Sequence, residues 1–386
     1  MTIDTAGAPS APGTTGVLGA AGPAGPLLTA RDVTTTLPVP AGRLRAVDGV
    51  SFALAPGEAL GIVGESGSGK SMLARTLMGL APPTARTTGS VWFAGRDLLT
   101  AGPEELREVL GSGIAMVFQD SATSLNPVTR VGWQLTETLR LRRGMDRRPA
   151  REEAVDLLRR VGIPDPERRA RSYPHELSGG MRQRACIALA IACGPRVLLA
   201  DEPTTALDVT VQRQILDLLA SLRRGAGMGL VLITHDLALV AGRTERLLVM
   251  YAGRVVETGP TRAVIRAPHH PYTAALLASI PRLDQPGHSR LATIPGRPAA
   301  ALDPRPGCRF APRCPRAQPR CRREDPVLGP VTDPGIAATA TAPGIAAAGI
   351  AAGIGTVARP GEHHTVACFH PHDSPPPGPD VPQEPR

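Results

Sequence analysis

The sequence predicts an α/β protein in which helices cover a mainly parallel β-sheet. Short apolar segments alternate along the chain with longer segments of helical periodicity, and this alternation is typical of parallel strands connected by helices. One apolar segment leads directly into a glycine-rich loop, and another ends in two adjacent carboxylates. The pattern therefore predicts both a fold class and a place where phosphates bind.

The composition allows such a fold and argues against one class of partner. The chain has 386 residues, 42% of them hydrophobic and 3% aromatic, so we expect one large domain or two smaller ones. The net charge is +9, but arginine is spread along the chain without an aromatic-interleaved basic stripe. Nucleic acid is therefore not an expected partner.

The sequence contains no recognisable export or membrane-spanning segment. Residues 1–26 lack a basic start and an apolar core, so they do not fit a signal peptide. Residues 335–357 are uncharged, but they are mostly Ala and Gly and include Pro343, so insertion into a bilayer would gain little. We expect a cytosolic protein that reaches a membrane only through a partner.

The predicted elements begin at Leu27. Alternation or apolar runs predict strands at residues 28–33, 50–54, 59–63, 91–93, 114–118, 197–200 and 229–234. Helical periodicity predicts helices at residues 70–78 and 209–223 and a helical insert at about 128–184. Residues 247–251 and 254–257 predict a hairpin about Ala252-Gly253.

The glycine-rich loop fits a phosphate-binding pattern. Its residues are Gly64, Glu65, Ser66, Gly67, Ser68, Gly69, Lys70 and Ser71. The loop follows a predicted strand and opens a predicted helix, so its backbone N–H groups can converge on phosphates at the helix N-terminus. Lys70 is predicted to reach the β- and γ-phosphates, and the Ser71 hydroxyl to bind Mg²⁺.

Asp201 and Glu202 end the apolar strand predicted at residues 197–200. A carboxylate is costly at the end of a buried strand unless it meets a cation or water. We therefore predict that Asp201 binds Mg²⁺, through water. Glu202 is predicted to act as the general base that polarises the attacking water.

Together with Leu177-Ser178-Gly179-Gly180-Met181, these motifs give the chain its family likeness. Residues 27–260 resemble the ATPase subunit of an ATP-binding-cassette (ABC) transporter. The resemblance implies a P-loop NTPase core of the RecA type. It also implies a helical subdomain at about 128–184 that carries the signature, and an antiparallel β subdomain. ATP and Mg²⁺ are the cofactors that it implies.

The resemblance assigns roles to further residues. Gln119 matches the glutamine loop, which contacts Mg²⁺ and water and faces the membrane subunit. His235 matches the switch histidine that senses the γ-phosphate, and Asp208 lies in the loop that crosses the dimer interface. Leu37 takes the place of the aromatic residue that usually stacks on adenine.

Ser178, Gly179 and Gly180 begin a predicted helix, so they present N–H donors and the positive end of a helix dipole. In the resembled family, these residues bind the γ-phosphate of a nucleotide held by the opposite cassette. ATP then joins two ATPase subunits, and hydrolysis releases them. The resemblance therefore implies a second ABC ATPase as partner.

Three further segments resemble the oligopeptide, dipeptide and nickel importer ATPases. They are Thr123-Ser124-Leu125-Asn126-Pro127, His270-Pro271-Tyr272-Thr273, and the run from Gly307 to Pro315 that contains Cys308 and Cys314. Residues 261–371 are predicted to form the C-terminal extension of that family. A low-complexity insertion is predicted at about 327–360, and a disordered Pro-rich tail at 372–386, as at 1–26.

The extension contains Cys308, Cys314, Cys321 and, after a long gap, Cys368. Close Cys-x2–4-Cys pairs typical of zinc modules do not occur, and four cysteines without histidine partners suit an iron–sulfur cluster. Members of the resembled family carry a [4Fe–4S] cluster at such cysteines. Zinc and no metal stay open as alternatives, whereas disulfides do not suit a reducing cytosol.

The resemblance implies that the protein hydrolyses ATP to drive import of di- or oligopeptides. It would sit on the cytoplasmic face of the cell membrane with a second ATPase and two permeases, served indirectly by an extracytoplasmic solute-binding protein. Import of nickel or another small solute is one alternative. A soluble ABC ATPase unconnected with transport is another, although the chain lacks a long coiled coil and a second phosphate loop.

Overall fold

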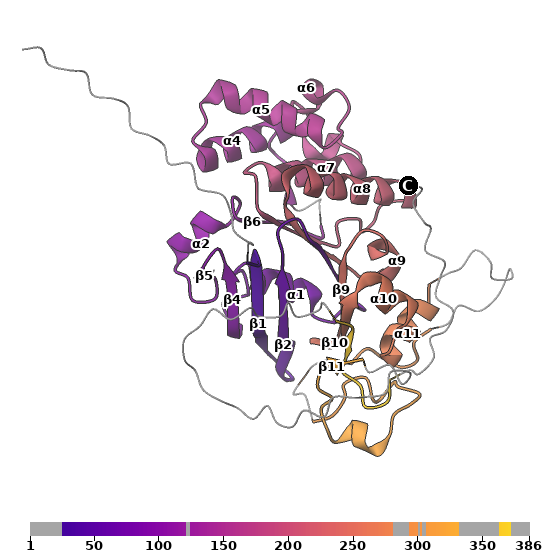
Figure 1. The fold of residues 1–386 in the computed structure, drawn as a ribbon. Coiled ribbons are helices and arrows are strands. Elements are labelled where there is room, and N and C mark those ends of the chain that lie inside the picture. Colours follow the sequence, from indigo (N-terminus) through magenta and orange to yellow (C-terminus); the bar gives the residue numbers. More distant parts are fainter. Residues whose placement is uncertain are drawn as a thin grey trace, which may run out of the picture.

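A computed structural model describes residues 25–120, 124–280, 293–299, 302, 306–331 and 363–371. The tails predicted at 1–26 and 372–386 lie almost entirely outside the described residues, as does most of the insertion predicted at 327–360. The described chain forms two β-sheets with helices around them (Figure 1). The predicted α/β fold class is confirmed.

Eight strands form the larger sheet of the described chain, in the order β11-β12-β10-β9-β3-β8-β7-β6. Its first three strands are β11 (Gly329–Pro330), β12 (Thr365–Val366) and β10 (Arg254–Pro260). Its parallel part consists of β6 (Ile114–Val117), β7 (Val197–Asp201), β8 (Gly229–Thr234), β3 (Ala59–Val63) and β9 (Arg246–Tyr251). Every residue of these five strands is buried. A continuous apolar run is what a strand needs when both faces of its sheet are covered.

The second sheet is antiparallel, in the order β2-β1-β4-β5. It consists of β2 (Gly42–Leu54), β1 (Leu28–Val39), β4 (Arg86–Phe93) and β5 (Arg96–Asp97). Helix α1 (Lys70–Leu77) contacts β1, β2 and β7, and its buried leucines belong to the same core cluster as the apolar residues of β1 and β2. The start of α1 is thereby fixed between the two sheets.

Helices of the cassette occur where they were predicted, at about 128–184 and at 209–223, and two more, α2 (Pro103–Val109) and α9 (Leu237–Val240), were not predicted. Those in the predicted ranges are α4 (Val131–Arg143), α5 (Arg147–Arg160), α6 (Pro166–Arg169), the 3-10 turn η1 (Pro174–Glu176), α7 (Gly179–Ile191) and α8 (Val209–Ala226). In Figure 1, α4, α5 and α6 lie together at the top of the molecule above α7 and α8. Apolar residues of α4, α5 and α7 join the core cluster that contains β7 and β8.

The C-terminal part of the chain packs at the other end of the molecule from α5 (Figure 1). It contains β10 (Arg254–Pro260), α10 (Thr261–Arg266), α11 (Pro271–Ala278), the 3-10 turn η2 (Pro319–Arg322), β11 (Gly329–Pro330) and β12 (Thr365–Val366). Strand β12 pairs with both β10 and β11, so the main sheet fixes the position of Cys368, two residues past the end of β12. None of the helices described is both long and apolar enough to span a bilayer.

Candidate functional site

The glycine-rich loop joins β3 to α1 in a shape that only glycine allows at two positions. Gly69 has φ of 100°, and a Cβ there would lie 2.0 Å from the Ala46 carbonyl oxygen. A Cβ on Gly64 would lie 2.1 Å from the Met250 carbonyl oxygen. Because any side chain would collide with backbone at both positions, the sequence needs glycine there to keep the loop wrapped in front of α1.

Lys70 fills the inside of this loop. Its Nζ donates to the carbonyl oxygens of Gly64 at 2.7 Å and Glu65 at 3.0 Å, and the residue is only 4% exposed. Burial lowers the Lys70 pKa, although the carboxylates of Glu202 and Asp201 act in the opposite direction. A buried ammonium that the loop's own carbonyls hold is well placed to meet phosphate oxygens.

The first helical turn meets the end of β7 through one hydrogen bond. The Ser71 hydroxyl donates to Asp201 Oδ1 at 3.0 Å. Burial raises the Asp201 pKa, and the hydrogen bond from Ser71 opposes this shift. One hydroxyl and one carboxylate beside a phosphate loop are hard oxygen donors of the kind that Mg²⁺ uses together with nucleotide phosphates. Ser71 and Asp201 therefore fit a Mg²⁺ ion.

Glu202 lies among the residues predicted to act on the γ-phosphate. Its Oε2 accepts hydrogen bonds from Gln119 Nε2 at 2.9 Å and from the Thr205 hydroxyl at 3.1 Å. His235 Nδ1 lies 3.3 Å from the other oxygen, Oε1. Glu202 has a backbone φ of 44°, which is unfavourable for any residue other than glycine. Such strained backbone conformations are concentrated at functional sites. The structure thus brings Gln119, Glu202 and His235 together.

The signature residues form a separate group with the start of α8. Ser178 is the N-cap of α7, where its side chain accepts from the Met181 N–H at 3.3 Å. A Cβ on Gly180 would lie 2.8 Å from Val211 on α8. Asp208 caps α8 by accepting from the Val211 N–H at 2.9 Å. The side chains of Ser178 and Asp208 therefore each cap the start of their own helix.

The residue in the adenine position lies near the tip of the β1–β2 hairpin. Leu37 is half-buried and pairs in register with Leu44 on β2. Leu44 in turn forms an isolated bridge with Leu302 of the C-terminal part. The C-terminal part therefore reaches the hairpin beside Leu37, and an adenine contact by Leu37 stays a prediction.

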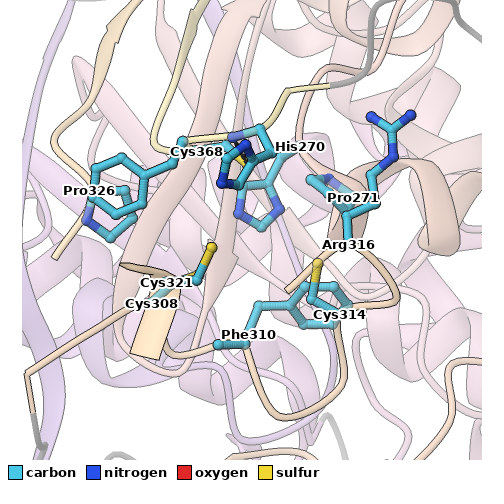
Figure 2. A pocket seen from close by; sticks show the side chains of 12 residues that line it. His270, Pro271, Cys308, Phe310, Cys314, Arg316, Cys321, Pro326 and Cys368 are labelled. Carbon is cyan, nitrogen blue, oxygen red and sulfur yellow. Dashed lines mark hydrogen bonds between the residues drawn. The ribbon is translucent and has the colours of Figure 1, made fainter. Parts of the chain in front are cut away.

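Four cysteines of the C-terminal part line a single pocket. Figure 2 shows Cys308, Cys314, Cys321 and Cys368 around it, with His270 and Phe310. Burial raises the thiol pKa of Cys308, Cys314 and Cys368, that of Cys368 to about 11. Within the described ranges, no group of three or more His, Cys, Asp or Glu side chains is arranged to hold a metal ion.

Comparison with known proteins gives the family. Residues 47–205 match the family described as ABC transporter, and residues 256–321 match the family described as oligopeptide/dipeptide transporter, C-terminal region. The dipeptide transport ATP-binding protein DppD of Escherichia coli (strain K12) is 50% identical over 290 residues, which are 75% of this chain and 88% of that protein. The chain belongs to the ABC transporter ATPases.

Further likenesses agree with this membership. The oligopeptide transport ATP-binding protein OppD of Salmonella typhimurium is 50% identical over 301 residues, covering 78% of this chain and 90% of that one. A solved dimeric structure of the ATP-binding cassette MJ0796, in a post-hydrolysis state with ADP and phosphate, is 30% identical with a TM-score of 0.55. It covers 61% of this chain and 99% of its own. This ABC protein is an ATP-binding subunit with ATPase activity.

Sequence reasoning missed several residues around the cysteine pocket of this ABC ATPase. It expected cysteines without histidine partners, but His270 lines the pocket and is 1% exposed. Its Nδ1 accepts from the Tyr272 N–H at 3.0 Å, so Nε2 carries the proton. Among the residues described, none accepts a hydrogen bond from His270 Nε2. The segment His270-Pro271-Tyr272 had marked the family, yet nothing in its letters indicated this contact.

Arg313 was also missed. It lies beside Cys314 in the sequence, but its guanidinium reaches the phosphate-binding loop and contacts Glu65. The two residues are 248 positions apart, so no local pattern could connect them.

Proposed function

We propose that this protein is the ATPase of an importer for di- or oligopeptides, docked on the cytoplasmic face of the cell membrane. The observation that carries the proposal is the extent of the likeness. About half of the residues are identical to those of dipeptide and oligopeptide transport ATP-binding proteins, over about nine-tenths of their length. The likeness includes the C-terminal region named for such transporters. The ATPase would pass its conformational change to two permeases. A solute-binding protein would be an indirect partner that does not contact this subunit.

We propose the following roles for the site residues. The backbone of residues 64–69 and the Lys70 ammonium would bind the β- and γ-phosphates. Ser71 and Asp201 would hold Mg²⁺, with Gln119 nearby, and the ion would neutralise charge on the phosphate oxygens. Glu202 would orient the attacking water and accept its proton as general base. His235, beside Glu202, would contact the γ-phosphate.

We propose that the site is completed by a second cassette. The N–H groups at the start of α7, at Ser178, Gly179 and Gly180, form the positive end of a 13-residue helix. The backbone of Gly180 lies close to Val211 of α8, where a Cβ would come within 2.8 Å. Glu202, in contrast, contacts Gln119 and His235. The MJ0796 cassette was solved as a dimer, which supports pairing of this chain with an identical or similar ATPase. Asp208 would lie at that interface.

Affinity purification of the tagged chain from membranes in mild detergent tests this assembly. Identification of the bound proteins by mass spectrometry should give two polytopic permeases and a second ABC ATPase. A Lys70→Ala variant serves as control, because it should keep the same partners while losing ATP binding. Recovery from the soluble fraction alone, without any permease, would contradict the proposal.

We further propose that the four pocket cysteines hold a [4Fe–4S] cluster. Four sulfur donors around one pocket suit such a cluster, and each would bind a different iron, so the sulfurs need not converge on one ion. The His270 Nε2–H, buried at the same pocket without an acceptor among the described residues, is a donor that could reach a cluster sulfur. Burial lowers the His270 pKa to about 4, so the ring stays neutral. Bound there, the cluster would supply a structural and redox-active centre.

Anaerobic purification followed by iron and acid-labile sulfide analysis tests the cluster. About four irons and four sulfides per chain are expected, and Cys314→Ser should lower both. Cys193→Ser is the matched control, because Cys193 is half-buried and does not line the pocket. Stoichiometric zinc, or a metal-free chain from anaerobic cells, would refute the cluster and leave the ATPase assignment unchanged.

A further inference from the structure

The loop between Cys308 and Cys314 reaches the phosphate-binding loop through a buried ion pair. Arg313 Nη1 donates to Glu65 Oε2 at 2.6 Å, and Nη2 donates to Glu65 Oε1 at 3.0 Å. The Arg313 side chain is 4% exposed and that of Glu65 22%. Two parallel N–H···O bonds fix both the distance and the orientation of the carboxylate. The C-terminal part of the chain thus contacts the nucleotide site directly.

Glu65 is held by its main chain as well. Its N–H donates to the Tyr272 hydroxyl at 2.8 Å, and its carbonyl oxygen accepts from Lys70 Nζ at 3.0 Å. The same residue therefore connects Tyr272 and Arg313, both from the C-terminal part, to the lysine that faces the phosphates. A movement of Glu65 would change where Lys70 is held.

Arg313 is itself firmly placed. Its Nε donates to the Pro295 carbonyl oxygen at 2.8 Å, and Nη2 donates to that of Ile294 at 3.2 Å. The guanidinium carbon also lies 5.8 Å from the centre of the Tyr251 ring. Together with the two bonds to Glu65 and one to the Tyr251 hydroxyl at 3.4 Å, the guanidinium donates five hydrogen bonds. The side chain is therefore held in one orientation, and it transmits the position of its own backbone to Glu65.

Both contacts on Glu65 begin at the wall of the cysteine pocket. Arg313 immediately precedes Cys314, and Tyr272 follows the pocket residues His270 and Pro271. Phe310 is another pocket residue, and the centre of its ring lies 5.4 Å from the centre of the Tyr272 ring. Since packed interiors transmit displacement, a change in the pocket reaches Glu65 by two routes.

A second arginine of the same loop, Arg309, also reaches toward the phosphate-binding loop. Arg309, next to Cys308, donates to the Ala252 carbonyl oxygen and pairs with Asp48. Gly253, which follows Ala252 in the chain, donates its N–H to the Ser68 carbonyl oxygen at 2.8 Å. Arg313 therefore contacts a side chain of the phosphate-binding loop, and Arg309 contacts the backbone beside Gly253, which is hydrogen-bonded to that loop.

We propose that Arg313 is a positioning residue of the phosphate-binding loop, and that through Glu65 it couples the state of the cysteine pocket to ATP binding. The proposal rests on the phosphate-binding role of residues 64–71 but not on the identity of any metal in the pocket. Coupling between two sites is reciprocal. A pocket with constrained cysteines should favour ATP, and bound ATP should constrain the cysteines.

A double-mutant cycle on Arg313 and Glu65 tests the positioning role. Arg313→Ala in the full chain should raise the ATP dissociation constant and KM by about 5- to 150-fold, with kcat changed less than about threefold. In a Glu65→Gln background, the same substitution should add little, because its effect passes through the carboxylate. Arg313→Lys should restore part of the affinity, since it returns the charge without the second hydrogen bond.

Arg323→Ala is the matched control, because Arg323 donates to the Pro319 carbonyl oxygen at 3.4 Å in the same extension and lines neither the cysteine pocket nor the phosphate loop. Its ATP affinity should equal that of the wild type. Unchanged ATP affinity in Arg313→Ala, or effects of Arg313→Ala and Glu65→Gln that simply add, would overturn the proposal. Lys70→Ala, measured in parallel, reports whether the phosphate loop binds ATP at all. Wild-type affinity in Lys70→Ala would refute the phosphate-binding role, whereas lost affinity in Lys70→Ala with unchanged affinity in Arg313→Ala would refute only the positioning role.

Thiol alkylation tests the coupling without a cluster or enzyme turnover. In the metal-free chain, ATP should slow iodoacetamide labelling of Cys308 and Cys314, measured by mass spectrometry, with Cys193 as the internal reference. In Arg313→Ala at saturating ATP, this protection should disappear. Equal protection in wild type and variant would show that the pocket and the phosphate loop are not coupled through Arg313.

Discussion

Gln119 Nε2 donates a 2.9 Å hydrogen bond to Glu202 Oε2 across 83 residues of sequence. The loop after β6 is thereby connected to the end of β7. With Thr205 on the same oxygen and His235 near the other, three neighbours orient the Glu202 carboxylate. A general base needs its orientation set before the water arrives, and these contacts provide it.

Glu202→Gln should lower the rate of ATP hydrolysis by about 10²- to 10⁴-fold, the usual contribution of a general base. The amide keeps the size of the side chain and can still accept from Gln119, so ATP binding should persist and the closed dimer should accumulate. Phosphate release and size-exclusion chromatography with ATP measure the two effects. Glu104→Gln, an exposed carboxylate on α2, should change neither, and wild-type hydrolysis by Glu202→Gln would remove Glu202 from this role.

Asp201→Asn should make the nucleotide-free protein more stable while abolishing Mg²⁺-dependent hydrolysis. Burial raises the Asp201 pKa above 3.8, so its contribution to folding is most favourable when it is protonated and is lost as pH rises through the native pKa. A neutral amide can still accept from Ser71. We expect a gain on the order of 1 kcal/mol in the free energy of unfolding near pH 7.

Urea denaturation of apo Asp201→Asn and wild type checks the sign, and the gain should shrink as pH falls. Asp217→Asn is the control, because that exposed carboxylate pairs with Arg243 on the surface and should change stability by less than about 1 kcal/mol. A variant less stable than the wild type at neutral pH would contradict the argument.

Ser178→Ala should separate stability from activity. Loss of the N-cap on α7 should cost about 1 kcal/mol of stability. If Ser178 also donates to the γ-phosphate across a dimer, ATP-dependent dimerisation should weaken by a further 10- to 100-fold or so, as for a hydrogen bond to a charged group. Analytical ultracentrifugation with and without ATP measures the second effect. Ser178→Thr keeps a capping hydroxyl and should lose less of both, and wild-type dimerisation by Ser178→Ala would limit Ser178 to capping.

The local sequence pattern was sufficient to predict the place of those site residues that lie at the end of a strand or the start of a helix. Gly64–Ser71, Asp201 and Ser178 could be placed because an apolar run meets a polar residue within a few positions. Strand β1 was predicted to end at Val33 but continues to Val39. Residues 34–39 are rich in β-branched residues, but they include Pro38 and lack clean alternation, and the pairing with β2 and β4 extends the strand through them.

The surroundings of the cysteine pocket could not be predicted because they depend on contacts between distant segments. Cys368 approaches the other three cysteines since β12 joins the edge of the sheet at β10. The sequence shows only two short β-branched residues there, Thr365 and Val366. Arg313 is one of many arginines in the sequence, and nothing local distinguishes it from those on the surface.

Glu257→Gln should destabilise the protein most at neutral pH and release β12. Glu257 is fully buried on β10 and accepts from the N–H groups of His269 and His270 and from His364 Nε2 at 2.7 Å. Burial alone would raise its pKa, but these donors outweigh it and hold the pKa below 4.5. Stability from such a group is present above about pH 4.5 and is lost as pH falls through the native pKa.

The expected loss for Glu257→Gln is therefore about 1.5–3 kcal/mol near pH 7, the range for hydrogen bonds to a charged group, and smaller near pH 3.5. Urea denaturation at pH 7 and at pH 3.5 measures this loss of stability. Glu167→Gln is the control, because its exposed ion pair with Arg159 should contribute little to stability at either pH. Since His364 leads into β12, alkylation of Cys368 in the metal-free chain should also become faster in Glu257→Gln. A pH-independent loss, or unchanged Cys368 labelling, would mean that Glu257 does not hold β12 through its charge.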